Sequence, residues 1–351
     1  MTKVLVGMSG GVDSSVAAYL LKEAGYEVYG ATMQIQDDLD GCCGSLSSVN
    51  DASAVAEQLG IPYFVMNLKE EFRQYVKDKF KSDYLNGLTP NPCILCNRYL
   101  KWGSFLKRAE EIGCDYIATG HYGKIVQTPS GRYSVQLSDS DSKDQSYVLY
   151  SLSQEMLKKT LMPVGCYEKD EIRKIAAKLG LKVADKKDSQ DICFIPDGDY
   201  KAFIKRETGS LGKTGNIITE DKEIIMPHDG IAGFTVGQRK GLGVALGFKA
   251  YVTDIDPVSG DVTMGRSENL FTSRAYAKDL NYMADEVFDP EYIYTVKTRY
   301  SQSRTEARIS YETGDLIRVD FLNAVRAPTP GQALVIYRED LIAGGGIIIK
   351  K

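Results

Sequence analysis

The chain has 351 residues, of which 43% are hydrophobic and 26% charged, and its formal net charge is −4. This length accommodates two or three domains, and the composition is that of an ordinary soluble globular protein with a sizeable core. The acidic total does not indicate a nucleic-acid-binding protein, although a sum over the whole chain conceals any local basic face.

No apolar run is long enough to span a bilayer, and the first residues lead directly into a predicted strand without a separate signal segment. We therefore expect a cytoplasmic protein that does not bind membranes. The seven cysteines are Cys42, Cys43, Cys93, Cys96, Cys114, Cys166 and Cys193. In a reducing compartment, metal binding, sulfur chemistry or core packing explains them better than a disulfide framework.

Strand and helix patterns alternate through the first half of the chain. Apolar spacing and glycine stops predict strands at 4–8, 26–33, 61–67 and 115–119, and helices at 14–24, 49–59, 69–85, 98–112 and 169–179. Strands that are separated by helices indicate an α/β fold with a doubly wound parallel sheet.

The sequence pattern changes after about residue 205, where glycines become frequent and the helical periodicity of apolar residues disappears. Strand-like patterns then occupy residues 292–300, 307–310, 316–321 and 333–337, with turn residues between them. We therefore expect three domains: an α/β domain at 1–204, a small β-rich domain at 205–274 and a β-barrel or sandwich at 275–351.

The strongest local signal is residues 9–15, Ser-Gly-Gly-Val-Asp-Ser-Ser, between the first predicted strand and helix. Glycines let the backbone approach an anion, and the hydroxyl and amide groups at a helix start point donors at it. Asp13 could hold a Mg²⁺ beside phosphates. The spacing fits neither a Walker loop nor a dinucleotide fingerprint. The alternative interpretation is an ordinary glycine-rich turn before a capped helix.

This loop resembles the pyrophosphatase loop of the ATP-pyrophosphatase (adenine nucleotide alpha hydrolase-like) superfamily. The resemblance implies ATP and Mg²⁺ as cofactors, cleavage of ATP between its α and β phosphates, and transfer of AMP to a substrate oxygen. The residues that it places around ATP are Gly7, Met8, Ser9, Gly10, Gly11, Val12, Asp13 and Ser14, together with Met33 and Gly120 against the adenosine.

Further motifs narrow the resemblance. They are residues 89–98 (Thr-Pro-Asn-Pro-Cys-Ile-Leu-Cys-Asn-Arg), 119–122 (Thr-Gly-His-Tyr), 143–147 (Lys-Asp-Gln-Ser-Tyr), 188–194 (Asp-Ser-Gln-Asp-Ile-Cys-Phe) and 236–241 (Val-Gly-Gln-Arg-Lys-Gly). With the phosphate loop they are similar to the tRNA-specific 2-thiouridylases over essentially the whole chain. That family implies ATP-dependent 2-thiolation of the wobble uridine of tRNA, which yields 2-thiouridine, AMP and diphosphate, and a carboxy-terminal β-barrel.

The resemblance makes Cys96 a nucleophile and Cys193 the carrier of a persulfide. The uridine 2-carbonyl is a poor electrophile, so its oxygen must first be adenylated before sulfur replaces it. Attack of Cys96 on the persulfide then leaves a disulfide between the two cysteines. Two cysteines far apart in the sequence should therefore meet in space.

Cys93 departs from the commonest family pattern, which has an aspartate at this position. The change creates a Cys-x-x-Cys pair, so Cys93, Cys96 and Cys193 could alternatively hold a [4Fe-4S] cluster with one open iron. A zinc site that also uses Cys42 and Cys43 is a weaker option, since two adjacent cysteines chelate awkwardly. For Cys114 and Cys166 we expect buried packing roles.

The family resemblance also implies contacts to tRNA. The residues are Asn91, Pro92, Cys93, His121, Lys143, Asp144, Gln145, Arg299, Tyr300 and Gln332. For His121 the alternative is a hydrogen-bonded structural histidine. Residues 230–253 contain three cations and no acidic residue, which suits either a phosphate-tracking surface or a solvated loop.

The expected partners are the anticodon arm of tRNA and a sulfur donor, either a cysteine desulfurase or a sulfur relay protein, and we expect the chain to act as a monomer. Two other functions account for less of the sequence. An adenylating ligase of small molecules would not need the two cysteines, and an RNA-binding protein without catalysis would leave the phosphate loop unexplained.

Overall fold

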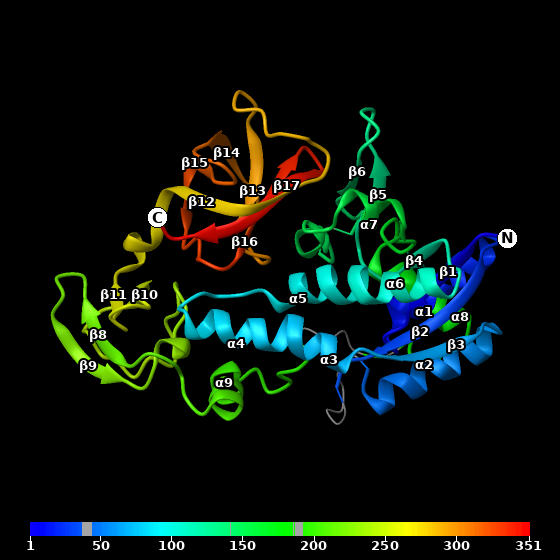
Figure 1. Cartoon of the computed structure of the whole chain (residues 1–351), viewed down its shortest axis with the longest axis horizontal. Helices are drawn as coiled ribbons and strands as arrows, with labels where there is room; N and C mark the ends of the chain where they lie inside the picture. The colour runs from blue at the N-terminus through cyan, green and yellow to red at the C-terminus, as the bar shows by residue number, and fades with distance from the viewer. Residues whose placement is uncertain (37–43, 141, 185, 187–191) are drawn as a thin grey trace.

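The computed structural model describes residues 1–36, 44–140, 142–184, 186 and 192–351. It contains an α/β domain, a small β-sheet and a β-barrel, with the small β-sheet and the α/β domain at opposite ends of the molecule (Figure 1). No helix among these residues is long and apolar enough to cross a membrane.

A parallel five-stranded sheet forms the α/β domain, as predicted. Its strands are β1 (Lys3–Gly7), β2 (Glu27–Gln34), β3 (Tyr63–Asn67), β4 (Tyr116–Ala118) and β7 (Thr160–Leu161), in the order β3-β2-β1-β4-β7. The strand order reverses between β1 and β4, and in open α/β sheets ligands bind outside the carboxyl ends of the strands at such a point.

Helices cover both faces of this sheet. In β1, Val4 and Val6 belong to the same core as α1 (Val12–Glu23), α2 (Leu46–Leu59) and α8 (Lys169–Lys178), while Leu5 faces the opposite core. The opposite core is built by two helices with π-helical segments. The first comprises α3 (Lys69–Phe72), η1 (Arg73–Lys77) and α4 (Asp78–Leu85); the second comprises α5 (Pro92–Leu95), η2 (Cys96–Ser104) and α6 (Phe105–Glu111).

The second of these helices begins at Pro92, so the prediction of a start near residue 98 was wrong. The Asn91 side chain caps the helix by accepting the Cys93 N–H at 3.1 Å, and proline stands at the first helical position. Cys93 and Cys96 therefore lie on the helix rather than on the loop before it.

The prediction missed a hairpin that joins the α/β domain to the barrel. It consists of β5 (Lys124–Gln127) and β6 (Tyr133–Gln136), and β6 pairs with the last barrel strand, β17 (Leu341–Ile349), at Gln136 and Leu341. The Ser134 hydroxyl donates to the Ile342 carbonyl at 2.7 Å. Short helices η3 (Ser146–Leu149) and α7 (Gln154–Lys158) follow the hairpin.

The middle part is mostly β, as predicted. Its sheet has the order β10-β11-β8-β9, formed by β8 (Gly215–Thr219), β9 (Ile224–His228), β10 (Tyr251–Ile255) and β11 (Val262–Gly265). Helix α9 (Tyr200–Thr208) leads into it, and the turn η4 (Ile231–Gly233) packs on α4. The expected domain limit between residues 204 and 205 falls within α9, so the boundaries stay a prediction.

The carboxy-terminal part is an antiparallel six-stranded barrel that closes through pairing of its first and last strands. Turn η5 (Ser267–Leu270) precedes it, and its strands are β12 (Phe271–Tyr282), β13 (Tyr294–Lys297), β14 (Thr305–Tyr311), β15 (Ile317–Arg326), β16 (Ala333–Arg338) and β17. Closure removes the exposed strand edges that an open sheet would present. The barrel starts a few residues before the expected limit at 275.

Candidate active site

The phosphate loop follows β1 at the switch point of the sheet. Gly11 is the N-cap of α1 in extended conformation, and Gly10 has a positive φ of 70°. A Cβ at Gly10 would lie 2.4 Å from the Ser48 carbonyl oxygen, so this position requires glycine for two reasons. The start of α1 carries backbone N–H groups without helical partners, which is the arrangement that binds phosphate.

Hydroxyl groups fix the shape of this loop. The Ser14 hydroxyl accepts the Ser9 N–H at 3.1 Å and donates to the Gly11 carbonyl at 3.2 Å, and the Ser15 hydroxyl donates to the same carbonyl at 2.8 Å. Ser14 and Ser15 are buried. The loop is thus preorganised by its own side chains.

The Asp13 carboxylate is engaged by two donors from other segments. The Lys169 ammonium lies 2.7 Å from each carboxylate oxygen, and the Tyr122 hydroxyl donates to one of them at 2.7 Å. An ammonium group therefore stands where we expected Mg²⁺, and Asp13 does not present an open ligand set for a divalent cation. No sequence pattern indicates this role for Lys169, which is 156 residues away.

A second lysine reaches the same loop. The Lys186 ammonium donates to the Gly10 carbonyl at 3.0 Å and to the Asp51 carboxylate at 2.8 Å. Lys186 stands just before the motif at 188–194, whose first four residues lie outside the described part of the chain. Lys186 thereby links the phosphate loop to α2, which carries Asp51.

The two predicted adenosine contacts belong to β2 and to the end of β4, the strands on either side of β1. Gly120 follows β4, and a Cβ added there would lie 2.6 Å from the Ser14 nitrogen and 2.7 Å from the Asp13 carbonyl carbon. This close approach brings the end of β4 against the start of α1. Met33 lies near the end of β2, half-buried against the core.

Cys96 and Cys193 pack against one core, and the segments that carry them contact the same helical element. Cys96 begins η2 and Cys193 lies in a turn, and both are half-buried against one core. Segments α5 and η2 contact η1, while the Phe194 ring lies 5.5 Å from Phe72 and 5.3 Å from Phe80 on the same helix. The structure thus brings the cysteine-bearing segments together around the helix at 69–85.

The other cysteines differ in exposure. Cys93 is exposed, and Cys114 is buried as expected, which raises the pKa of its thiol. Cys166 is exposed, so the expectation of a buried packing role was wrong; it follows the tight turn at Gly165, whose backbone packs on Gly123. Cys42 and Cys43 lie outside the described residues.

Metal binding is one of the roles expected for the cysteines, and it requires several ligand side chains close together in the described residues. Among them, no three His, Cys, Asp or Glu side chains are placed so that they could hold a metal ion. Cys93 is exposed and Cys96 and Cys193 are half-buried, and a [4Fe-4S] cluster on these three cysteines stays a prediction.

His121 is held between two hydrogen-bonding partners. Its Nε2 lies 3.1 Å from the Lys101 ammonium, its Nδ1 lies 2.8 Å from the Thr119 hydroxyl, and its ring is 5.4 Å from that of Trp102. Burial, followed by the charge of Lys101, lowers the pKa of His121 well below its ordinary value. The imidazole is therefore neutral, with Nε2 accepting from Lys101 and the proton assigned to Nδ1.

Several predicted tRNA-binding residues meet where the barrel touches the α/β domain. The Gln332 amide donates to the Thr89 carbonyl at 2.8 Å, just before Asn91, and the Tyr300 hydroxyl donates to the Asp144 carbonyl at 3.2 Å. Burial raises the pKa of Tyr300, and the charge of Asp144 and then that of Cys93 add to the effect. The residues expected at the target base and those of the barrel therefore share one junction.

Other predicted tRNA residues have structural partners. Gln145 accepts the Tyr122 N–H at 3.0 Å, and the Asp144 carboxylate accepts the Ser138 N–H at 3.1 Å. Lys143 lies beside them at the start of the same loop, in a half-buried position. These contacts fix the loop that faces the barrel.

Arg299 is half-buried and connects the barrel to the glycine-rich loop of the middle domain. Its guanidinium donates to the Val236 carbonyl at 2.7 Å and to the Thr329 hydroxyl, while its Nε is buried without a hydrogen-bond partner. Burial lowers its pKa, and the neighbouring charge of Arg326 adds to this effect. Its predicted role in tRNA binding therefore coexists with a structural one.

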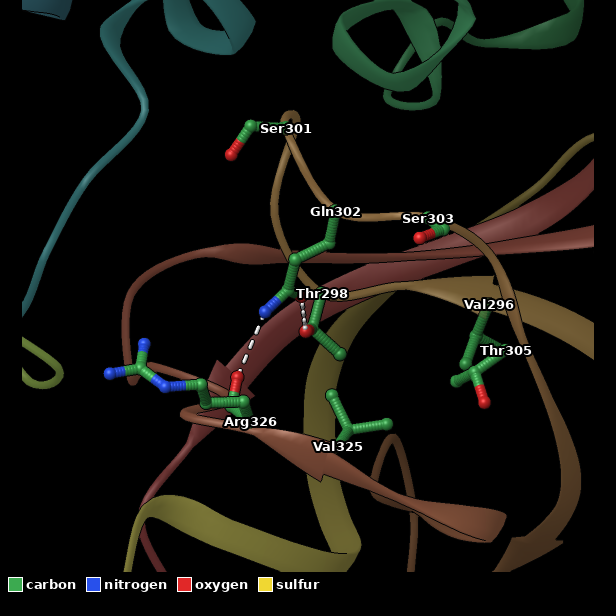
Figure 2. Close-up of a pocket in the computed structure, with 8 residues that line it drawn as sticks. All are labelled: Val296, Thr298, Ser301, Gln302, Ser303, Thr305, Val325 and Arg326. Carbon is green, nitrogen blue, oxygen red and sulfur yellow. Dashed lines mark hydrogen bonds between the residues drawn. The ribbon is translucent and has the colours of Figure 1, made fainter. Parts of the chain in front are cut away.

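The surface hollows lie away from the phosphate loop. One of about 270 Å³ opens on the barrel beside Arg299 and Tyr300, and Figure 2 shows Gln302 at its centre, where its amide donates to the Arg326 carbonyl at 2.8 Å. Another of about 340 Å³ lies where the three parts of the chain meet. Neither includes a residue of the phosphate loop or a cysteine.

Family models match all three parts of the chain. Residues 2–197 match the tRNA methyl transferase HUP domain, residues 201–266 the tRNA methyl transferase PRC-barrel domain, and residues 272–348 the Aminomethyltransferase beta-barrel domain.

Relatives that match over nearly the whole chain have about half of their residues identical to it. The tRNA-specific 2-thiouridylase MnmA of Lachnoclostridium phytofermentans is 52% identical over 358 residues, which cover 100% of both chains. The tRNA-specific 2-thiouridylase MnmA 2 of Clostridium tetani is 50% identical over 354 residues, which cover 99% of this chain and 98% of the other.

A solved structure with partial likeness is the U34-tRNA thiolase NcsA from Methanococcus maripaludis with its [4Fe-4S] cluster. It is 20% identical with a TM-score of 0.37, and the match covers 59% of this chain and 67% of that one. A likeness at this level supports no conclusion about the site.

Proposed function

This chain belongs to the family of tRNA-specific 2-thiouridylases, enzymes of ATP-dependent tRNA 2-thiolation, and we propose a residue-level course for its reaction. The protein is a tRNA-uridine sulfurtransferase. Adenylation accounts for the presence of the phosphate loop. Sulfur transfer accounts for the two half-buried cysteines, whose segments both pack on the helix at 69–85. Methyl transfer, which the names of two family models mention, would require neither feature.

In the first step, ATP would bind over the start of α1, with Met33 and Gly120 against the adenosine. The wobble uridine would leave the anticodon stack and lie at residues 91–93, at a cost of a few kcal/mol that contacts with the barrel offset. Its 2-oxygen then bonds to the α-phosphorus, and the bond from that phosphorus to the bridging oxygen breaks. Pyrophosphate leaves with the electron pair.

In the second step, the terminal sulfur of a Cys193 persulfide attacks carbon 2 and AMP departs with the C–O electron pair. The Cys96 thiolate then attacks the Cys193 sulfur, which releases the thiouridine sulfur and forms a disulfide. A dithiol reductant must reduce that disulfide before the next cycle. The packing of both segments on the helix at 69–85 supports this pairing.

The cofactor at this site is ATP, with Mg²⁺ arriving on its phosphates. Because Asp13 already faces Lys169 and Tyr122, no step here is assigned to a metal ligated by that carboxylate. A [4Fe-4S] cluster on Cys93, Cys96 and Cys193 remains the rival arrangement. In the persulfide course, Cys93 would lie at the substrate base.

The partners that this course requires are tRNA and a source of persulfide sulfur. The junction of Gln332 with Thr89 and of Tyr300 with Asp144 is where the anticodon arm would lie. A cysteine desulfurase or a relay protein would load Cys193. We expect a monomer that acts in the cytoplasm, where tRNA is modified.

The observation that carries the proposal is that the segments with the two half-buried cysteines pack on one helix, in the domain that also holds the phosphate loop. Anaerobic protein should be assayed for thiolation with ATP, tRNA and sulfide while its iron content and visible spectrum are recorded. Activity from iron-free protein supports the persulfide course. Activity that tracks iron and a broad visible band would instead support the cluster, and no thiolation in either preparation would refute both.

A further inference from the structure

Lys101 is a half-buried cation that no carboxylate of the described residues neutralises. Among the described residues its ammonium has one polar partner, the neutral imidazole of His121. The two other lysines at this edge of the sheet differ, since Lys169 is paired with Asp13 and Lys186 with Asp51. Burying a charge without a counter-ion is unfavourable, so the surroundings of Lys101 suit an anionic ligand.

The position of Lys101 identifies that anion. His121 follows Gly120, whose backbone packs against the Ser14 nitrogen at the start of α1. The hydrogen bond to His121 therefore places the ammonium at the carboxyl end of β4, the end at which α1 also starts. Among the anions of this reaction, the phosphates of ATP are the ones that bind there.

The helix that carries Lys101 also carries Cys96. Segment η2 has the i→i+5 hydrogen bonding of a π-helix, as at the Phe105 N–H and the Leu100 carbonyl. Residues five positions apart lie about one turn apart in such a helix, so Lys101 and Cys96 lie on the same side. The ammonium thus stands between the sulfur chemistry and the nucleotide.

We propose that the Lys101 ammonium contacts the α-phosphoryl group of ATP and of the adenylated uridine, and that His121 positions it. The inference rests on the proposed function. The α-phosphoryl group carries negative charge while the uridine oxygen replaces pyrophosphate, and it gains more when AMP leaves with the C–O electron pair. The Lys101 ammonium compensates this charge without transferring a proton.

His121 acts through Lys101 in this scheme. Its Nδ1 proton is held by the Thr119 hydroxyl, which fixes the ring and directs the Nε2 lone pair at the ammonium. A protonated imidazole would repel Lys101 and could not accept its hydrogen bond. The neutral state of His121 is therefore required for the arrangement.

The test isolates adenylation by using Cys193→Ser protein, in which sulfur transfer is blocked. With ATP labelled at the α-phosphorus, transfer of label to tRNA is followed in a single turnover. Lys101→Met should slow it about 10²- to 10³-fold, the effect of removing one charge-stabilising donor, while Lys101→Arg should stay within about tenfold. Lys107→Met, an exposed lysine six residues further along, is the matched control and should leave the rate unchanged.

A wild-type rate in Lys101→Met would overturn the inference while leaving the proposed function intact. Absence of tRNA labelling in the parent Cys193→Ser protein, together with absence of thiolation by wild type, would instead refute the proposed function. Thermal melting of each variant separates loss of folding from loss of rate, and an unfolded Lys101→Met is replaced by Lys101→Gln in the same comparison.

The role of His121 is tested by measuring whether its variants change kcat or the KM for tRNA. His121→Gln, which keeps an acceptor for Lys101, should retain kcat within about tenfold, and His121→Leu should lose about 10²-fold in kcat with little change in KM for tRNA. A raised KM for tRNA with normal kcat in His121→Leu would show that His121 binds tRNA directly, and would overturn its positioning role.

Discussion

The Lys169 ammonium lies 2.7 Å from both carboxylate oxygens of Asp13, so the first residue of α8 is ion-paired with the second residue of α1. The Lys169 side chain is 10% exposed and that of Asp13 28%. Since Tyr122 donates to the same carboxylate, one aspartate holds together three segments that are distant in the sequence.

Lys169→Met should therefore destabilise the fold, because it leaves a mostly buried carboxylate without its counter-ion. We expect the free energy of unfolding to fall by about 2 kcal/mol, below the usual cost of breaking a buried pair since Asp13 is partly exposed. Urea denaturation measures this. Lys178→Met, exposed at the other end of α8, is the control, and equal midpoints for the two variants would contradict the prediction.

Gly120→Ala should disturb the phosphate loop, because its Cβ would lie 2.6 Å from the Ser14 nitrogen, where neither backbone can yield easily. Overpacking of this kind costs about 1–3 kcal/mol, and the strain falls on the anion site itself. Calorimetric titration should show weaker ATP binding. Gly233→Ala, whose added Cβ meets only Leu211 at 3.8 Å, should bind ATP normally.

Cys96→Ser and Cys193→Ser should each abolish thiolation while tRNA adenylation persists, because a serine hydroxyl can neither carry a persulfide nor resolve one. The measurement is 2-thiouridine content of tRNA after reaction, beside AMP release. Exposed Cys166 provides the control as Cys166→Ser, which should thiolate normally. Thiolation by both single variants would rule out the two-cysteine course.

The pKa of His121 is held well below its ordinary value in the folded protein, which makes stability depend on pH. Below about pH 6.5, where the unfolded histidine takes up a proton, the unfolded state binds more protons than the folded state. The free energy of unfolding should therefore decrease as the pH falls from 7.5 to 5.5. Urea titrations at both values should show a smaller decrease for His121→Gln, and an equal decrease would contradict this assignment.

Gln332→Ala should weaken tRNA binding without altering ATP binding. Its amide donates to the Thr89 and Pro90 carbonyls and so fixes the loop that leads to Asn91. Loss of bonds worth about 1 kcal/mol should raise KM for tRNA roughly fivefold. Gln127→Ala, which removes a comparable bond within an exposed hairpin, should leave KM unchanged.

The order of elements and the phosphate loop could be predicted from the sequence because both depend on local patterns. Apolar alternation in β1 and glycines at its end determine a strand and a turn wherever the rest of the chain lies. The loop position at the switch between β1 and β4 follows from the parallel sheet.

Contacts between distant side chains could not be predicted in this way. Lys186 and Gly10 are separated by 176 residues, and nothing in either neighbourhood indicates that they touch. The bond between Lys101 and His121 joins a helix to a strand end, and it becomes visible only when the helix start at Pro92 is known. Apolar neighbours also misled the prediction for Cys166, since exposure depends on the turn in which it lies.

The pairing of β6 with β17 means that the final nine-residue strand completes a sheet begun two hundred residues earlier. Truncating the chain before the barrel would remove β17 from beside β6, leave β5 as its remaining partner and open one edge of β6 to solvent. An isolated amino-terminal fragment should therefore self-associate rather than behave as a smaller enzyme. During synthesis this edge of β6 likewise stays open until β17 has left the ribosome.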